Sequence, residues 1–329
     1  MTLNGRSLWI LALALLPNGL LASGDDAGAI KTWNLNESLD NDANLVNTIY
    51  HGSSVKGLVV LPNGNLASVS DVTIKIWDIE AFTEIRTILT SYLNYIIALV
   101  LLPNGNLATA GLDTYLKVYN PNDGAEVRSF HARDYYVQLL ALLPSGDLVS
   151  WSNDNKIRIW NANDLSIIRT LARSDNVLMY AFAVLPDGNL AVSGEDDQVS
   201  ILDINDGSIV KTLPGHVGVQ NAIMLLKNGN LVDATDNEIN IWNMDDNRRL
   251  RIISGHRSAI KELAVLQNGY LASGDVSGLI KIWDVANQNR TVLLQTSMSV
   301  ESLAVLQNGY LAAGVGMMLK FCIFFIFSK

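Results

Sequence analysis

A short cluster, Leu-x-x-Gly, recurs eight times along the chain at a nearly constant spacing. Successive glycines of this cluster lie 45, 41, 41, 42, 41, 40 and 40 residues apart. Internal similarity at a period of about 40–45 residues is typical of folds that stack copies of one small β unit. The clusters begin at Leu16, Leu61, Leu102, Leu143, Leu185, Leu226, Leu266 and Leu306.

Each period contains the same series of local signals, shown here for the seventh copy. An apolar run over 260–266 is followed by an Asn-Gly turn, because both residues tolerate positive φ. A second short strand over 270–273 and a polar turn come next, and then the β-branched run 280–284 and a fourth strand over 290–294. No segment keeps a helical period. Each unit is therefore predicted to be a four-stranded antiparallel meander.

A single meander of this kind cannot bury both faces of its sheet. Copies packed side by side in a ring can do so, and the 49% hydrophobic content is ample for such a core. The sequence therefore predicts an all-β fold, a β-propeller of seven complete units. A partial eighth unit has two strands, over 299–306 and 310–313, before the pattern becomes irregular.

Tryptophan-aspartate pairs end the third strand of two units, at Trp77-Asp78 and Trp283-Asp284. Gly-His pairs precede the first strand of the sixth and seventh units, at Gly215-His216 and Gly255-His256. With these pairs at constant spacing, nearly the whole chain resembles the WD-repeat (WD40) family of β-propellers. Variants of the first pair occur at Trp33-Asn34, Trp160-Asn161, Trp242-Asn243, Tyr119-Asn120 and Leu202-Asp203.

The resemblance implies a structural network in each blade, which links an aspartate, the Gly-His histidine, a serine of the second strand and the tryptophan. The aspartate is expected six residues before the tryptophan, in a tight turn. The sixth unit then has Asp233 in place of the serine, and the seventh has Ser277 in place of the aspartate. The repeat residues assigned to this structural role are Asp71, Trp77, Asp113, Asp154, Trp160, Asp196, His216, Asp236, Trp242, His256, Ser273 and Trp283.

The two ends of the chain leave alternatives open. The stretch Thr2 to Gly5 aligns with Thr212 to Gly215, the end of a fourth strand, so it could complete the last blade. Otherwise the chain forms seven blades with a spare partial one, or is a fragment of a longer array. The apolar run 8–16 fits a first strand, with a signal peptide as the alternative. We expect the propeller to span 1–316 and an irregular apolar tail to span 317–329.

Composition limits the class of function. The net charge of −9 argues against direct contact with nucleic acid or anionic membranes. The single cysteine, Cys322, excludes an internal disulfide and favours a cytoplasmic location. No cofactor loop, metal-ligand spacing or nucleophile motif is recognisable, so we expect no catalytic, cofactor or metal site. The repeat register explains the four histidines as structural residues.

Large residues that break the repeat in the third and fourth units are the candidates for binding. Aromatic and arginine side chains are typical of protein interfaces. Trp151 stands where other copies have glycine, at Gly24, Gly194 and Gly274. The predicted protein-binding residues are Tyr95, Arg133, Tyr135, Tyr136 and Trp151.

The sequence thus predicts a monomeric, non-catalytic scaffold that binds other proteins or peptides. One alternative is a reader of phosphopeptides, for which Arg133, Arg173 and Arg257 are the available cations. Another is that the repeats belong to a larger multidomain protein. A propeller enzyme is disfavoured because the first strands are mostly apolar.

Overall fold

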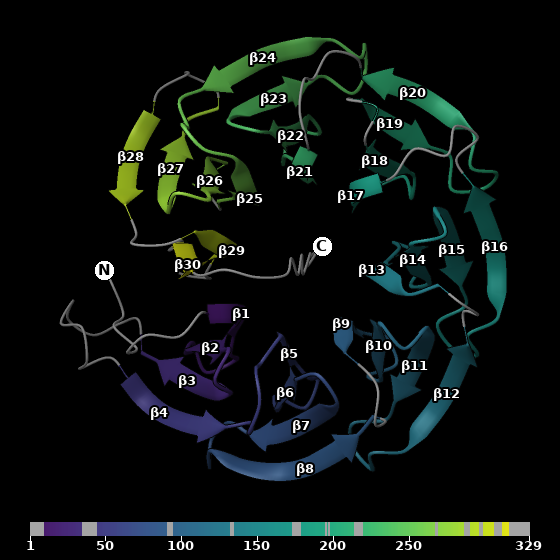
Figure 1. Cartoon of the computed structure of the whole chain (residues 1–329), viewed down its shortest axis with the longest axis vertical. Helices are drawn as coiled ribbons and strands as arrows, with labels where there is room; N and C mark the ends of the chain where they lie inside the picture. The colour runs from purple at the N-terminus through teal and green to yellow at the C-terminus, as the bar shows by residue number, and fades with distance from the viewer. Residues whose placement is uncertain are drawn as a thin grey trace.

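The computed structural model is a ring of β-sheets that surround a common axis (Figure 1). It describes residues 10–34, 45–90, 95–131, 135–172, 179–194, 196, 198–213, 220–266, 269–285, 290–295, 299–305 and 311–315. Within these ranges there are seven four-stranded antiparallel sheets and one two-stranded sheet, and no helix. The expected all-β propeller with seven complete units and a partial eighth is confirmed.

The strands follow one another as meanders, so each sheet, or blade, contains four consecutive strands. Blades 1 and 2 comprise β1 (Ile10–Leu15), β2 (Leu21–Asp25), β3 (Ala29–Trp33), β4 (Leu45–Tyr50), β5 (Gly57–Val60), β6 (Leu66–Val69), β7 (Thr73–Asp78) and β8 (Thr83–Leu89). Blades 3 and 4 comprise β9 (Ile96–Leu101), β10 (Leu107–Gly111), β11 (Tyr115–Tyr119), β12 (Glu126–His131), β13 (Val137–Leu142), β14 (Leu148–Ser152), β15 (Lys156–Trp160) and β16 (Ile167–Ala172).

The remaining strands continue the same order around the ring. Blades 5 and 6 comprise β17 (Met179–Val184), β18 (Leu190–Gly194), β19 (Val199–Leu202), β20 (Ile209–Leu213), β21 (Gln220–Leu225), β22 (Leu231–Thr235), β23 (Glu238–Trp242) and β24 (Arg249–Ser254). Blade 7 comprises β25 (Ile260–Val265), β26 (Leu271–Asp275), β27 (Leu279–Trp283) and β28 (Arg290–Gln295), and the last hairpin is β29 (Val300–Val305) with β30 (Leu311–Val315).

The Asn-Gly clusters form the turn between the first two strands of a blade. Gly19 has a φ of 83°, which glycine adopts without steric strain. The Asn18 side chain accepts a hydrogen bond from the backbone N–H of Leu20 at 3.2 Å. The same pairing recurs at 3.1 Å between Asn63 and Asn65. The repeated sequence cluster therefore fixes the same hairpin in successive blades.

Burial is greatest in the second strand of each blade and lowest in the outer, fourth strand. The second strands, such as β10 and β14, are buried along their whole length. The fourth strands, such as β12, are largely exposed and lie at the rim of the ring (Figure 1). Buried clusters join neighbouring blades, since one cluster contains both Leu102 of blade 3 and Leu165 of blade 4. The core is thus a series of interfaces between blades.

The hairpin β29–β30 occupies an eighth sector of the ring. It contacts β25 and β26 on one side and β1 on the other (Figure 1). Leu303, Val305 and Leu311 pack against a buried cluster of blade 7. The partial unit therefore lies between the last and first blades and is not a spare element outside the ring. The Thr2 to Gly5 segment and the tail 317–329 lie outside the described residues, so the expected closure and domain division stay predictions.

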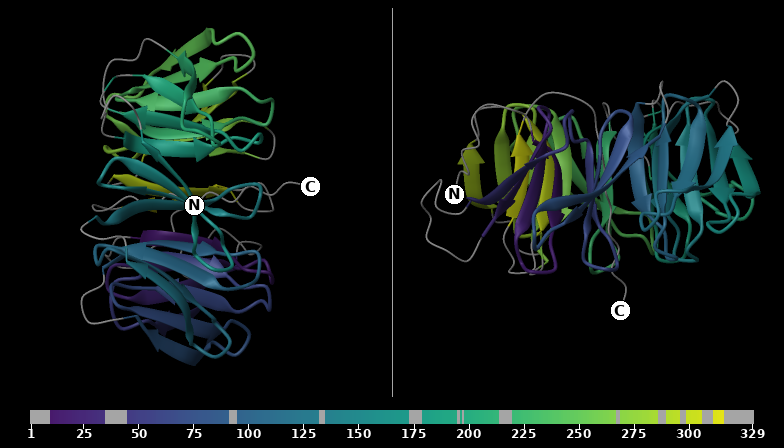
Figure 2. Two further views of the ribbon diagram at one scale, coloured as in Figure 1. Left: turned by 90° about the vertical axis from the view of Figure 1, so that its right-hand side faces the viewer. Right: turned by 90° about the horizontal axis from the view of Figure 1, so that it is seen from below.

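The strands run across the thickness of the ring, which gives the molecule two opposite faces (Figure 2). One face carries the connections between blades and the turns between second and third strands; we call it the loop face. The other carries the turns between first and second and between third and fourth strands; we call it the turn face.

Candidate functional site

A buried polar network in blade 7 contains the three residue types of a hydrolase triad. His256 Nδ1 lies 2.6 Å from Asp275 Oδ2, and His256 Nε2 lies 2.6 Å from Ser273 Oγ. The indole Nε1 of Trp283 donates to the same Ser273 oxygen at 2.7 Å. Asp275, at the end of β26, therefore supplies the carboxylate of the network, which was expected at the position of Ser277. That expectation was wrong because this aspartate lies in the strand end before the turn, and Ser277 instead donates to it at 2.6 Å.

The protonation of this network is fixed by burial and by hydrogen bonds. Burial lowers the pKa of His256, although the hydrogen bond to Asp275 opposes the shift. Burial would raise the pKa of Asp275, but hydrogen bonds from Ser277, from the Leu279 N–H and from His256 outweigh it and lower that pKa. An ionised Asp275 then accepts the Nδ1 proton of a neutral His256. Ser273 is 0% exposed and already accepts from Trp283, so a substrate cannot reach its oxygen.

Variants of this network occur in other blades. In blade 2, His51 lies 2.7 Å from Ser68 Oγ and 2.7 Å from Thr73 Oγ1, so a threonine stands where blade 7 has an aspartate. In blade 6, Trp242 Nε1 donates to Asp233, which is 0% exposed and also accepts from Asn240 at 3.2 Å. Trp77, Trp33 and Trp160 each donate to a second-strand serine at 2.7–2.8 Å. The expected tryptophan–serine contact is therefore present in blades 1, 2, 4 and 7.

The aspartates expected six residues before the tryptophan lie in the tight turns of the loop face. Asp154 is held by Arg158, whose Nη1 and Nη2 donate at 3.1 and 2.5 Å. Asp71 forms an ion pair with Lys56. Asp236 is exposed, and its backbone carbonyl accepts from the Ile260 N–H at 2.5 Å. Asp113 and Asp196 also lie in these turns, whereas His216 lies outside the described residues.

Exposed apolar and aromatic side chains gather on the loop face over blades 2–4. Tyr95 is 55% exposed, Leu112 47%, Tyr135 41% and Val72 37%. The two tyrosines were predicted from the sequence. Leu112 and Val72 were missed, although a large aliphatic residue in a turn that is polar in most other copies was a usable signal. We call these four residues the loop-face patch.

Backbone hydrogen bonds hold the loop-face patch in place. The Leu112 N–H donates to the Tyr95 carbonyl at 3.0 Å, and the Ile96 N–H donates to the Asp71 carbonyl at 3.1 Å. The ammonium group of Lys56 lies 5.0 Å from the centre of the Tyr95 ring. Because the turns of blades 2 and 3 are bonded to the same segment, Tyr95 is presented from a fixed position.

Trp151 does not belong to this surface. Its side chain is 5% exposed and lies in a buried cluster with Met179 of the next blade, so its prediction as an exposed binding residue was wrong. In the strand register Trp151 pairs with Leu139 of the first strand. Gly24 and Gly274 occupy the same register position in blades 1 and 7. In blade 5 this position is held by Ser193 and not by Gly194. This register position faces the neighbouring blade. Tyr136 is half-buried, and Arg133 lies outside the described residues.

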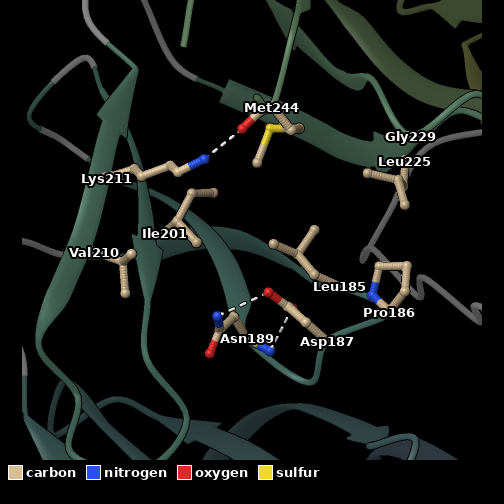
Figure 3. Close-up of a pocket in the computed structure, with 10 residues that line it drawn as sticks. All are labelled: Leu185, Pro186, Asp187, Asn189, Ile201, Val210, Lys211, Leu225, Gly229 and Met244. Atoms are coloured by element: carbon tan, nitrogen blue, oxygen red, sulfur yellow. Dashed lines mark hydrogen bonds between the residues drawn. The ribbon is translucent and has the colours of Figure 1, made fainter. Parts of the chain in front are cut away.

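A groove of about 260 Å³ opens between blades 5 and 6 on the turn face (Figure 3). Apolar side chains, including Leu185, Ile201 and Met244, form its walls. Asp187 lies at its edge, where its carboxylate accepts from the backbone and side chain of Asn189 at 3.0 and 2.9 Å. The Lys211 ammonium donates to the Met244 carbonyl across the two blades.

Within the residues that the structure describes, no three His, Cys, Asp or Glu side chains converge as metal ligands would. The same residues include no helix that is long and apolar enough to cross a membrane.

Comparisons with known proteins bear on the fold and on one repeat. Residues 247–284 match the family model described as WD domain, G-beta repeat. No curated protein matches the chain significantly in sequence. Among solved structures, a crystal structure of the computationally designed Ika8 protein superposes with a TM-score of 0.80 at 24% identity, over 95% of both chains. At this identity the likeness shows the fold alone.

Proposed function

We propose that this WD-repeat β-propeller is a non-catalytic scaffold, and that the loop-face patch binds a protein or peptide partner. Propellers of the WD-repeat type generally act as platforms for protein interactions. The observation that carries the proposal is the gathering of Val72, Tyr95, Leu112 and Tyr135 on one face of three adjacent blades. Large exposed apolar groups on a rigid frame are typical of interaction surfaces.

The chemistry of the patch favours a polypeptide over other partners. Tyrosine rings bury a large area and carry a polar tip, and tyrosine is enriched at protein interfaces. The net charge of −9 disfavours phosphate backbones and anionic lipid surfaces. Arg257, the described member of the three candidate phosphate-binding arginines, lies in the loop before blade 7, away from the blades that carry the patch. A monomeric cytoplasmic scaffold remains part of this proposal.

Site-specific photo-crosslinking in cell extract tests the proposal. A benzophenone amino acid is placed at Tyr95 or, as a control, at Tyr50, which is 68% exposed on the outer strand β4. We expect defined protein adducts from position 95 and none of the same mass from position 50. A Tyr95→Ala/Tyr135→Ala variant with unchanged melting should lose capture of those proteins. Equal adducts from both positions, or retention of the same proteins by the double variant in an affinity capture, would contradict the proposal.

A further inference from the structure

One position in the turn between third and fourth strands has a left-handed backbone in five successive blades. It lies five residues after the tryptophan position of each blade. In blades 3 and 5 it is glycine, but φ is 54° at Phe82, 57° at Leu165 and 61° at Asn247. Bulky residues rarely adopt positive φ because of steric strain, and asparagine does so more readily. Packing must therefore stabilise Phe82 and Leu165 in this conformation.

Phe82 and Leu165 fill the turn-face end of the interface with the preceding blade. Phe82 packs with Leu20 of blade 1 against the cluster that contains Ile79. Leu165 is 4% exposed and belongs to the cluster of Leu102 in blade 3. The side chain at this position thus acts as an apolar plug between two blades.

In the turns that contain glycine, a residue on the outer strand of the preceding blade fills the interface instead. A Cβ at Gly124 would lie 3.0 Å from the Arg86 Cδ of the preceding blade. A Cβ at Gly207 would lie 3.1 Å from the Leu171 Cβ of its preceding blade. In these two interfaces the neighbouring outer strand approaches the turn closely, so no plug is needed.

In the interface between blades 5 and 6 the turn position is neither an apolar residue nor a glycine, and from the outer strand β20 the Lys211 ammonium donates to the Met244 carbonyl. Asn247 stands where blade 2 has Phe82, and Asn189 stands where blade 1 has Leu20. The groove of about 260 Å³ lies at this place, between Val210 on one side and Met244 on the other (Figure 3). Asn247 Oδ1 is buried without a hydrogen-bond partner among the described atoms, so this oxygen forms no polar contact across the interface.

We propose that this groove receives one leucine- or phenylalanine-sized side chain of a partner polypeptide. The chain itself shows what fits, because Leu165 and the Leu20–Phe82 pair fill the equivalent places in two other interfaces. Sites for whole drug-sized ligands usually occupy about 300–1,000 Å³, so a groove of about 260 Å³ suits a single anchor side chain better. Such anchors contribute much of the energy of an interface.

This site is independent of the loop-face patch. It lies on the turn face, which is the opposite face of the ring, and in blades 5 and 6 instead of blades 2–4. One propeller could therefore hold two partners at once, which is the arrangement that a scaffold requires. Failure of either proposal leaves the other unaffected.

Methyl NMR on the full chain labelled with 13C-methyl methionine tests the groove directly. The probes are capped pentapeptides in which leucine or phenylalanine is flanked by glycine and serine, and the control peptide has glycine at the centre. The Met244 methyl signal, identified with a Met244→Leu variant, reports on the groove wall. We expect a saturable shift of this signal with the leucine and phenylalanine peptides and none with the glycine peptide.

Two filled-groove variants and one matched control complete the experiment. Asn247→Leu supplies the plug seen at Leu165 and should abolish the shift, whereas Asn163→Leu, at an exposed site in the corresponding turn of blade 4, should retain it. If Asn247→Leu does not fold, Val210→Phe fills the groove from the other blade. A shift that fails to saturate in the native chain, or one that persists in a filled-groove variant, overturns the proposal.

Discussion

At the scale of single residues, the buried polar side chains of blade 7 depend on one another. His256 is 3% exposed and connects Asp275 to Ser273. Its removal would leave a buried carboxylate and a buried hydroxyl without one of their partners, and such unsatisfied groups are destabilising by about 1–3 kcal/mol, more when charged.

We therefore expect His256→Ala to lower the free energy of unfolding by about 2–3 kcal/mol. Urea denaturation followed by tryptophan fluorescence measures the change. Asn163→Ala is the control, because Asn163 is exposed and surface substitutions usually change stability by less than about 0.5 kcal/mol. Equal effects of the two substitutions would mean that the blade 7 network contributes little.

The buried histidines also make stability depend on pH. Burial, assisted by the nearby Lys75 charge, lowers the pKa of His51 from 6.5 to about 4. Below pH 6.5 the unfolded chain binds a proton that the folded chain does not, so acidification favours unfolding until the pH falls to about 4. His256 acts in the same direction, since burial also lowers its pKa.

The free energy of unfolding should therefore fall by about 2 kcal/mol for His51 alone between pH 7.5 and pH 5, given 1.36 kcal/mol for each pH unit below 6.5. Urea titrations at the two pH values measure this difference. The variant His51→Gln should show a smaller pH dependence. An unchanged slope in His51→Gln would show that other groups cause it.

At the scale of single elements, the second strand of each blade decides how closely the next blade approaches. A Cβ at Gly24 would overlap Val55 of blade 2, and a Cβ at Gly274 would overlap Val300 of the last hairpin. Trp151 has the same register in β14 but packs in a cluster with the long, flexible Met179. In blade 4 the indole ring of Trp151 thus fills the space that the valine of the neighbouring element occupies next to blades 1 and 7.

Trp151→Ala should consequently lower the free energy of unfolding by about 3–5 kcal/mol, the range for large aromatic residues in cores. Trp151→Phe should cost clearly less, because the Trp151 Nε1 has no hydrogen-bond partner among the described atoms and its loss removes a buried unsatisfied donor. Tyr95→Ala serves as the exposed control. A neutral Trp151→Ala in thermal or urea unfolding would contradict the core position.

The same strand shows what the sequence could and could not predict. Regular Asn-Gly turns and alternating apolar runs act locally, so they predicted the elements and their order. Whether Trp151 is a binding residue or a core residue depends on the register with β13 and on the residue that the next blade presents. Asp275 was missed for a similar reason, since the network needs a carboxylate close in space to His256 and not at a fixed distance along the chain.

At the scale of the whole molecule, every blade relies on its neighbours to bury its apolar side chains. The stability of the ring therefore depends on the contact between the last and first blades. The hairpin β29–β30 provides that junction, with contacts to β25 and β26 on one side and to β1 on the other. The period of the sequence predicted a partial eighth unit, but its place in the ring depends on the packing between the first and last blades. Contacts that join the two ends of the chain are not encoded in local patterns.

Val300 is the residue at which this junction can be opened selectively. It is 0% exposed and lies against Gly274, where glycine permits its close approach. Val300→Asp places a charge in this apolar contact, which is strongly unfavourable without a partner. We expect hydrogen–deuterium exchange to accelerate in β29–β30, in β25–β26 and in β1, which lose a packed neighbour.

The strands of blades 3 and 4 should keep their protection, because the main contacts of β29 and β30 among the described residues are with β1, β25 and β26. Val127→Asp, at a 37% exposed site on β12, controls for the added charge and should leave exchange at the junction unchanged. Acceleration in every blade would mean that the ring opens as one cooperative unit. Unchanged exchange in β1 would show that the eighth sector does not hold the first and last blades together.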